Sequence, residues 1–121
     1  PTLWTADLQG RGPYAASPVL ARGLLFLVSH DRHATCLDAR TGALLWRQRL
    51  RGTECLASLV AAGDRVYFSD RSGLITVVAA DRAFRKLARN DLGEPLFATP
   101  APLPGRLVIR TAGHLWYIGH E

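Results

Sequence analysis

Long hydrophobic runs and helical periodicity are both missing from this 121-residue sequence. No segment of about 18 residues is apolar enough to span a membrane as a helix, and the first residues carry no signal segment. A start at Pro1, inside a strand pattern, is what we expect of a mature or excised piece. Hydrophobic residues nevertheless make up 48% of the chain and charged residues 21%, which is typical of a globular protein. Short apolar runs with alternating polarity predict an all-β fold.

Recognisable catalytic motifs are also missing. The sequence contains no Gly-x-Ser-x-Gly elbow, no phosphate-binding glycine loop and no His-Glu-x-x-His helix. Its 15 lysines and arginines against 10 acidic residues give a formal net charge of +5, and an arginine-rich face can bind nucleic acid or acidic lipid head groups. The arginines are spread through turns and strand faces, however, without a dense run or interleaved exposed aromatics. We therefore expect no nucleic-acid partner and no membrane span.

Cysteine is scarce, and the two residues that occur do not define a site. Cys36 falls within a predicted strand and Cys55 at the start of another, and a disulfide would need their Cα atoms within about 7 Å. The sequence leaves their redox state open, and we expect two free, largely buried thiols. His30 and His33, with Cys36 three residues further on, have the residue types of a zinc or copper site. Because the odd separation of His33 and Cys36 places them on opposite faces of a strand, we expect solvated hairpin histidines and no metal.

One segment occurs three times along the chain. "ASPVLARGLLFLVS" at 16–29 is followed by "ASLVAAGDRVYFSD" at 57–70 and "ATPAPLPGRLVIRT" at 98–111, a spacing of 41 residues both times. In each copy a small residue, a hydroxyl residue and an apolar run precede a glycine turn and a strand, and a further strand follows. A period near 40 residues with several short strands in each unit predicts the blades of a β-propeller.

The motif "DARTG" at 38–42 predicts a tight turn. Asp38 can accept hydrogen bonds from the backbone N–H groups that follow it, and Thr41 can do so more weakly. Gly42 can adopt a positive φ without steric strain. Alternation in the strand that follows predicts one buried and one solvated face, with Leu44, Trp46 and Leu50 on the first and Arg47 and Arg49 on the second.

The segment "ASPVLARGLLFLVSHDRHATCLDARTGALLWRQRL" resembles the pyrroloquinoline-quinone-like, or tryptophan-docking, β-propeller repeat of bacteria. The resemblance covers essentially the whole chain in three copies, and the segment at 91–119 also resembles the closing segment of bacterial members. It implies blades of four antiparallel strands and a periplasmic or other extracytoplasmic location. It also implies a structural repeat motif, made here of Asp38, Thr41, Gly42 and Trp46, whose tryptophan packs against the neighbouring blade.

The second and third copies depart from this pattern. "AADRAFRKLARNDLGE" keeps Asp81 but has no Thr-Gly pair and no tryptophan, so Phe84 or Leu87 is expected to take over the packing. The third copy stops after its third strand. Its fourth strand is expected at the other end of the chain, where "TLWTADLQG" at 2–10 resembles "LLWRQRLRG" with Trp4 in the place of the motif tryptophan. The sequence thus predicts one propeller segment of three blades, at 14–52, at 55–93, and at 96–119 together with strand 2–9.

Three blades cannot close a ring, because propellers need at least four. We expect head-to-tail association in which the N-terminal strand of one copy completes the last blade of the next, a heterologous contact that closes into a ring. A dimer, which we favour, would have six blades, and a trimer would have nine. The alternative is that the remaining blades belong to a longer chain, and the sequence leaves open whether the chain is complete.

Ligand-binding residues are expected on one face of the propeller. In a four-stranded blade, the connections that lead into the innermost strand and those between the second and third strands open on the same side, around the channel. The "DARTG" turn lies on the opposite side and is expected to be structural. The polar residues best placed to meet a ligand are Arg11, Tyr14, His30, His33, Glu54, Arg71, Glu94, Arg110 and His114.

The family that the repeat resembles includes quinoprotein dehydrogenases. These hold pyrroloquinoline quinone and calcium over the propeller, and many stack the quinone on a disulfide between adjacent cysteines. This sequence has no Cys-Cys pair, Asn90 is its one asparagine, and Glu54 and Glu94 are isolated. We therefore expect no catalytic residue and no cofactor, and a non-catalytic scaffold that binds protein partners. A fragment of a quinone-dependent oxidoreductase is the alternative, and the sequence does not indicate which ligand or partner is bound.

Overall fold

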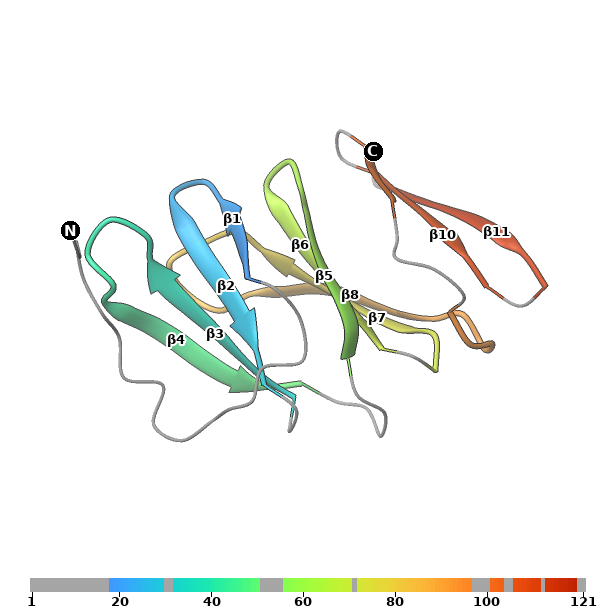
Figure 1. Ribbon diagram of the computed structural model, residues 1–121, viewed down its shortest axis with the longest axis horizontal. Coiled ribbons are helices and arrows are strands. Elements are labelled where there is room, and N and C mark those ends of the chain that lie inside the picture. The colour runs from blue at the N-terminus through green and yellow to red at the C-terminus, as the bar shows by residue number, and fades with distance from the viewer. Residues whose placement is uncertain are drawn as a thin grey trace.

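Every regular element of the described structure is a β-strand, and the strands form three sheets that lie side by side (Figure 1). The computed structural model describes residues 18–29, 32–50, 56–70, 72–96, 101–103, 106–111 and 113–119. Within these ranges no helix could cross a membrane. The strands are β1 (Val19–Ala21), β2 (Leu24–Val28), β3 (His33–Asp38), β4 (Leu44–Arg49), β5 (Leu56–Ala62), β6 (Arg65–Asp70), β7 (Leu74–Ala79), β8 (Lys86–Asp91), β9 (Ala101–Leu103), β10 (Arg106–Arg110) and β11 (Leu115–Gly119).

Each sheet is an antiparallel meander in which strands that are consecutive in sequence pair with each other. The first sheet has the order β1-β2-β3-β4, the second β5-β6-β7-β8, and the third β9-β10-β11. The first strands of the three sheets, β1, β5 and β9, contact one another in turn, as the innermost strands of propeller blades do. The predicted all-β, four-stranded antiparallel architecture is therefore confirmed.

The predicted blade limits stay predictions, because several of the segments they depend on lie outside the described residues. Residues 1–17 contain the strand expected to complete the third blade, and residues 97–100 precede β9. Within the described part of the third sheet, an isolated bridge between Leu96 and Thr111 continues the pairing beyond β9. The split-blade arrangement is accordingly taken up below as a proposal.

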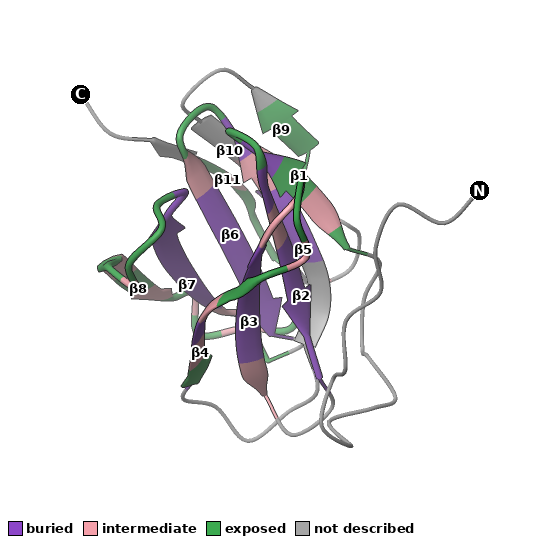
Figure 2. Ribbon diagram, turned by 90° about the vertical axis from the view of Figure 1, so that its left-hand side faces the viewer, coloured by how far each residue is buried: buried purple, intermediate pink, exposed green. Residues whose placement is uncertain are grey.

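Burial divides the strands of the two four-stranded sheets into middle and outer ones (Figure 2). The middle strands β2, β3, β6 and β7 are almost wholly buried, as their uniformly apolar sequences predicted. The outer strands β4 and β8 are polar and half exposed. Sheets that are covered on both faces in this way must pack against neighbouring sheets.

Two hydrophobic clusters hold the three sheets together. Phe26 and Trp46 of the first sheet pack with Phe68 of the second, and Tyr67 of the second sheet packs with Ile109 of the third. Because successive side chains of a strand point to opposite faces, neighbours in β6 serve different cores. The second sheet therefore has no solvated face along its middle strands, whereas the first and third sheets each end the array.

A β-bulge occurs at the same place in the outer strand of both four-stranded sheets. The pairing of β3 with β4 skips Leu45, and the pairing of β7 with β8 skips Leu87. An extra residue reverses the alternation of faces beyond it. Trp46 lies on the buried face as predicted, but Leu44, predicted on that same face, lies on the other one and is 48% exposed. The prediction for Leu44 was wrong because strict alternation does not allow for a bulge.

Candidate functional site

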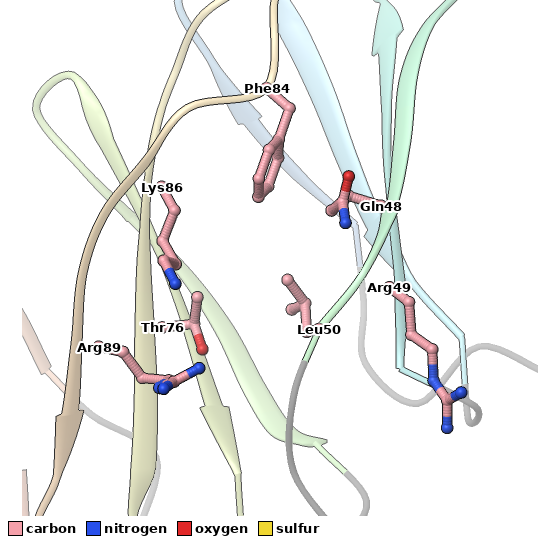
Figure 3. Close-up of a pocket in the computed structure, with 7 residues that line it drawn as sticks. All are labelled: Gln48, Arg49, Leu50, Thr76, Phe84, Lys86 and Arg89. Atoms are coloured by element: carbon pink, nitrogen blue, oxygen red, sulfur yellow. The ribbon is translucent and has the colours of Figure 1, made fainter.

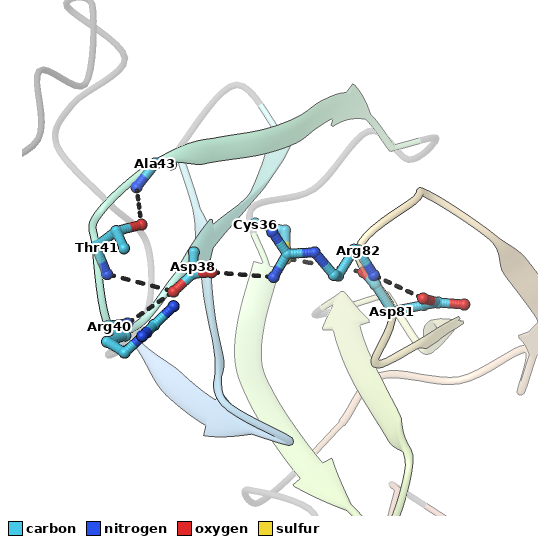
Figure 4. A network of polar contacts seen from close by, with 7 residues as sticks. All are labelled: Cys36, Asp38, Arg40, Thr41, Ala43, Asp81 and Arg82. Atoms are coloured by element: carbon cyan, nitrogen blue, oxygen red, sulfur yellow. Dashed lines mark hydrogen bonds and ion pairs between the residues drawn. The ribbon is translucent and has the colours of Figure 1, made fainter.

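The "DARTG" turn between β3 and β4 has the conformation predicted for it (Figure 4). Asp38 Oδ1 accepts hydrogen bonds from the backbone N–H groups of Arg40, at 2.9 Å, and Thr41, at 3.3 Å. Thr41 Oγ1 accepts one from the backbone N–H of Ala43 at 3.3 Å, and Gly42 has a φ of 80°. These local bonds fix the Asp38 carboxylate, whose second oxygen is turned to the neighbouring sheet.

Asp38 connects the first two sheets through an ion pair. Its Oδ2 lies 3.0 Å from Nη1 of Arg82, in the segment that follows β7. The hydrogen bond from Arg82, together with those from the turn backbone, holds the pKa of Asp38 below its usual range. The carboxylate is therefore charged at neutral pH. Arg82 was not among the sequence-predicted residues, because the motif predicts the turn and not the partner that the turn meets.

Trp46 docks on the same segment of the second sheet. Its indole N–H donates to the carbonyl oxygen of Asp81 at 3.1 Å, and its ring centroid lies 5.9 Å from that of Phe26 and 5.1 Å from that of Phe84. The thiol of Cys36 lies 3.9 Å from the same carbonyl oxygen. The motif tryptophan therefore packs against the neighbouring sheet.

Of the two expected substitutes for a tryptophan in the second sheet, Leu87 takes part in the packing against the third sheet and Phe84 does not. Phe84 packs against Trp46, edge to face, so it completes the interface between the first and second sheets. Leu87 packs in the other cluster, between the second and third sheets. The residue that pairs as Trp46 does is Ala88, opposite Val77. Aliphatic side chains together with Tyr67 and Trp116 therefore fill the second interface.

A second polar cluster brings together predicted ligand-face residues at the third sheet. Glu94 Oε1 accepts hydrogen bonds from Thr111 Oγ1 and, at 3.1 Å, from the backbone N–H of Gly113, and it lies 2.8 Å from Nδ1 of His114. The indole N–H of Trp116 donates to Thr111 Oγ1 at 2.8 Å. The segment that leads into the third sheet is thereby fastened to the turn between β10 and β11.

The electrostatics of this cluster favour a charged Glu94. Hydrogen bonds from Thr111 and then from His114, with a further one from the backbone of Gly113, lower the pKa of Glu94 to about 2. The acceptor capacity of one carboxylate oxygen is used within the cluster itself. Glu94 and His114, predicted separately as ligand contacts, thus contact each other.

The other predicted ligand-face residues are placed only in part. Arg110 lies exposed at the end of β10 and lines a shallow hollow together with His114. His33 begins β3 and is half buried opposite Arg49. As ligand contacts, all of the predicted residues stay predictions. Those outside the described residues are Arg11, Tyr14, His30, Glu54 and Arg71, together with Trp4 of the structural repeat motif.

Cys36 is a free and buried thiol, as predicted, whereas Cys55 lies outside the described residues. Burial raises the pKa of Cys36 to about 12, so the protonated form prevails and the thiolate needed for metal binding is disfavoured. Cys36 faces the core between the first two sheets, and His33 lies three residues before it at the start of β3, partly exposed. Within the described ranges no three His, Cys, Asp or Glu side chains are grouped as metal ligands.

A groove that the sequence did not predict lies between the outer strands β4 and β8 (Figure 3). From the second sheet, the side chains of Lys86, Thr76 and Arg89 point into it, and Gln48 points into it from the first, whereas Arg49 points away. In a regular strand, residues 86 and 89 would lie on opposite faces, so the pattern gave no signal. The lining residues are Gln48, Arg49, Leu50, Thr76, Phe84, Lys86 and Arg89.

Comparison with known proteins gives consistent matches. Residues 1–92 match the family described as outer membrane protein assembly factor BamB. BamB of Escherichia coli strain K12 is 26% identical over 106 residues, which are 87% of this chain and 26% of that protein. The crystal structure of BamB from Moraxella catarrhalis superposes with a TM-score of 0.75 at 18% identity, over 94% of this chain and 36% of that one. The crystal structure of quinohemoprotein alcohol dehydrogenase from Comamonas testosteroni superposes with a TM-score of 0.67 at 16% identity, over 88% of this chain and 18% of that one.

These matches differ in what they establish. The chain spans about a quarter of the length of the curated relative from E. coli, and structural likeness at identities of 16–18% shows the fold alone. The family match is broader, because it covers most of the chain, including the Asp38 turn, Trp46 and the Arg82 segment against which they dock. The chain therefore belongs to the bacterial family of pyrroloquinoline-quinone-like repeat proteins described as outer membrane protein assembly factor BamB.

Proposed function

We propose that this chain is a non-catalytic β-propeller module that acts as an interaction scaffold in the assembly of outer membrane proteins, in an extracytoplasmic compartment of a bacterium. The observation that carries the proposal is the family match over residues 1–92. The matched region contains the docked tryptophan and the Asp38–Arg82 ion pair. Both are inter-sheet contacts, so they support a role for this motif in holding a rigid binding platform together.

The similarity to a quinohemoprotein alcohol dehydrogenase supports the fold and not the reaction. It rests on 16% identity and covers 18% of the dehydrogenase chain. The relative from E. coli is named as an assembly factor and matches 87% of this chain. A scaffold function is therefore proposed in preference to quinone-dependent oxidation.

We further propose that the end sheets complete a closed ring with additional blades. β11 is the outer strand of the third sheet and exposes Leu115, at 75%, and Tyr117, at 64%, while Leu20 of β1 is 63% exposed at the other end of the array. Strand 2–9 of one copy would pair with β11 of the next copy, and two copies would give six blades. The other source of blades is further repeats of a longer chain.

A chimaera tests the scaffold function. In E. coli BamB, the 106 residues that match this chain would be replaced by the corresponding segment, and the chimaera would be expressed in a strain that lacks BamB. We expect restored levels of β-barrel outer membrane proteins, measured by immunoblot. The same chimaera with Trp46→Ala is the matched control and should restore less. A chimaera that accumulates folded to normal levels and restores nothing would reject the scaffold function.

A further inference from the structure

The groove between β4 and β8 combines two cations with an apolar wall. Lys86 and Arg89 are exposed, and no hydrogen bond or ion pair within the described structure involves either side chain. None of the seven lining residues is a carboxylate. Leu50 is buried, at 5% exposure, and Phe84 is only partly buried, so the apolar surface beside the two positive charges comes mainly from Phe84.

The bulge at Leu87 is what places the two cations together. Lys86 pairs with Val78 and Arg89 pairs with Thr76, and Val78 packs in the cluster between the first and second sheets. Thr76, two residues from Val78 in β7, shares its face. Both cations therefore project from the face of the second sheet that is turned to the first. Figure 3 shows their ends directed into the groove.

Gln48 supplies the opposite side of the groove. Gln48 pairs with Ala34 and lies two residues after Trp46 in β4. Its side chain is therefore on the same face as that of Trp46, the face that is turned to the second sheet. Its amide has both donors and an acceptor and points into the groove (Figure 3). An amide of this kind can bond the N–H and C=O of an extended backbone, which a purely cationic surface cannot do.

We propose that this groove binds an acidic, extended segment of a partner protein. An Asp or Glu carboxylate of that segment lies between Lys86 and Arg89, and an apolar side chain of the segment packs on the exposed part of Phe84. The inference deepens the proposed scaffold function, on which it rests, because it names the class of partner. Charge complementarity is the argument: two cations without an ion pair among the described residues favour an anionic occupant, and the guanidinium of Arg89 can hold a carboxylate by two hydrogen bonds.

The same groove does not fit a polyanionic surface. Nucleic acid is held by a series of phosphate contacts along a basic stripe, and anionic membranes are held by clusters of about 4–8 basic residues. Here the two cations that point into the groove flank an apolar wall, and the third cation of its lining, Arg49, points away (Figure 3). A single carboxylate followed by an apolar side chain matches that arrangement.

Fluorescence anisotropy with a defined probe tests the proposal. The probe is a fluorescein-labelled peptide of about ten residues in which glutamate alternates with leucine, titrated with the 121-residue chain at low salt, about 50 mM. We expect saturable binding that Lys86→Glu with Arg89→Glu weakens about tenfold or more. The matched control is Arg22→Glu with Arg40→Glu, two exposed arginines outside the groove, which should weaken binding less than about threefold. Circular dichroism verifies that both variants are folded.

Three results would overturn the groove assignment. These are equal weakening by both variant pairs, no weakening by either, and displacement of the peptide by a DNA duplex or by phosphatidylglycerol vesicles with the same dependence on residues 86 and 89. The chimaera keeps this test separate from the scaffold function. Restored outer membrane protein levels without peptide binding reject the groove alone, and peptide binding without restored levels rejects the scaffold function alone.

Discussion

Trp46 is the side chain that joins the sequence motif to the packing of the sheets. It is 9% exposed, packs between Phe26 of its own sheet and Phe84 of the next, and donates its indole N–H to the backbone carbonyl of Asp81. A large aromatic buries much apolar surface, and its N–H needs a partner once water is excluded. The second sheet supplies the hydrogen-bond acceptor and part of the apolar contact, so the loss of unfolding free energy on replacing Trp46 reports largely on the inter-sheet interface.

Replacing Trp46 with alanine should lower the free energy of unfolding by about 3–5 kcal/mol. Trp46→Phe should cost about 1–2 kcal/mol, because it keeps an aromatic ring but removes the indole hydrogen bond to the Asp81 carbonyl. Arg49→Ala, at an exposed residue of the same strand, is the control and should change the value by less than about 0.5 kcal/mol. Urea denaturation followed by circular dichroism measures all three. Similar losses at both positions would contradict the docking role.

Glu94 should make stability depend on pH below the neutral range. Its pKa in the folded protein is about 2, against an ordinary value of 4.5. Because the folded state binds this proton more weakly than the unfolded state, the stabilisation by Glu94 is present above about pH 4.5 and is lost as the pH falls through about 2. Glu94→Gln keeps an acceptor oxygen without the titration. The difference in unfolding free energy between the two proteins, measured with urea at several pH values, should shrink over that range, and a constant difference would argue against the assignment.

The sequence predicted residue roles where the contacts are local. Asp38, Thr41 and Gly42 act within one turn, so their roles follow from residue type and spacing. Arg82 was missed because it is 44 residues from Asp38, and the Asp81 carbonyl is 35 residues from Trp46. Such pairs depend on how one sheet lies against the next, which a single motif does not encode.

At the scale of elements, the turn between β6 and β7 depends on one glycine. Gly73 has a φ of 103°, and a side-chain carbon on it would overlap the backbone carbonyl of Glu94. The backbone N–H of Leu92 donates to the carbonyl oxygen of Gly73 at 2.9 Å. The turn and the segment that leads into the third sheet are therefore in direct backbone contact, with no room between them for a side chain.

Gly73→Ala should therefore be more harmful than a substitution at a glycine in open space. Gly93 also has a positive φ, 75°, but has nothing near its missing side chain, so Gly93→Ala should cost about 1–2 kcal/mol from backbone strain alone. Gly73→Ala should cost at least about twice as much, because overpacking adds to the strain. Chemical denaturation of both variants measures the difference. Equal losses would show that the close approach to Glu94 is relieved without penalty.

Strands were predicted more accurately than the faces of their residues. Apolar runs and glycine turns identified β2, β3, β6 and β7, because a strand buried on both faces needs a continuous apolar run. The bulges at Leu45 and Leu87 were not predicted, since a one-residue irregularity leaves composition unchanged. The bulges explain both the wrong face predicted for Leu44 and the unexpected position of Lys86 and Arg89 on one face.

At the scale of the molecule, the three-copy repeat was enough to predict the architecture. A period of 41 residues in a chain of 121 implies three similar units, and each unit must bury its faces against a neighbour. How the array ends could not be predicted in the same way. The third sheet has three strands within the described residues, and the periodicity does not indicate what pairs with its outer strand.

Light scattering on the purified chain tests head-to-tail closure. We expect a mass of twice 13.2 kDa for the favoured dimer. Deletion of residues 1–9 should give monomers, because it removes the strand proposed to pair with β11. Leu115→Asp should also weaken association, by about tenfold or more, because it buries a charge in the proposed contact. A stable, folded monomer of the full chain would reject strand exchange between copies and would favour further repeats in one chain.

The reactivity of Cys36 can report how often the first two sheets separate. Its sulfur lies beneath Trp46 at the Asp81 carbonyl, fully buried, so a thiol reagent can reach it only after the interface opens. In a chain with Cys55→Ser, the rate at which a coloured disulfide reagent modifies Cys36 therefore reports the opening equilibrium of that one interface. Cys36 is thus an internal probe for the separation of the first sheet from the second.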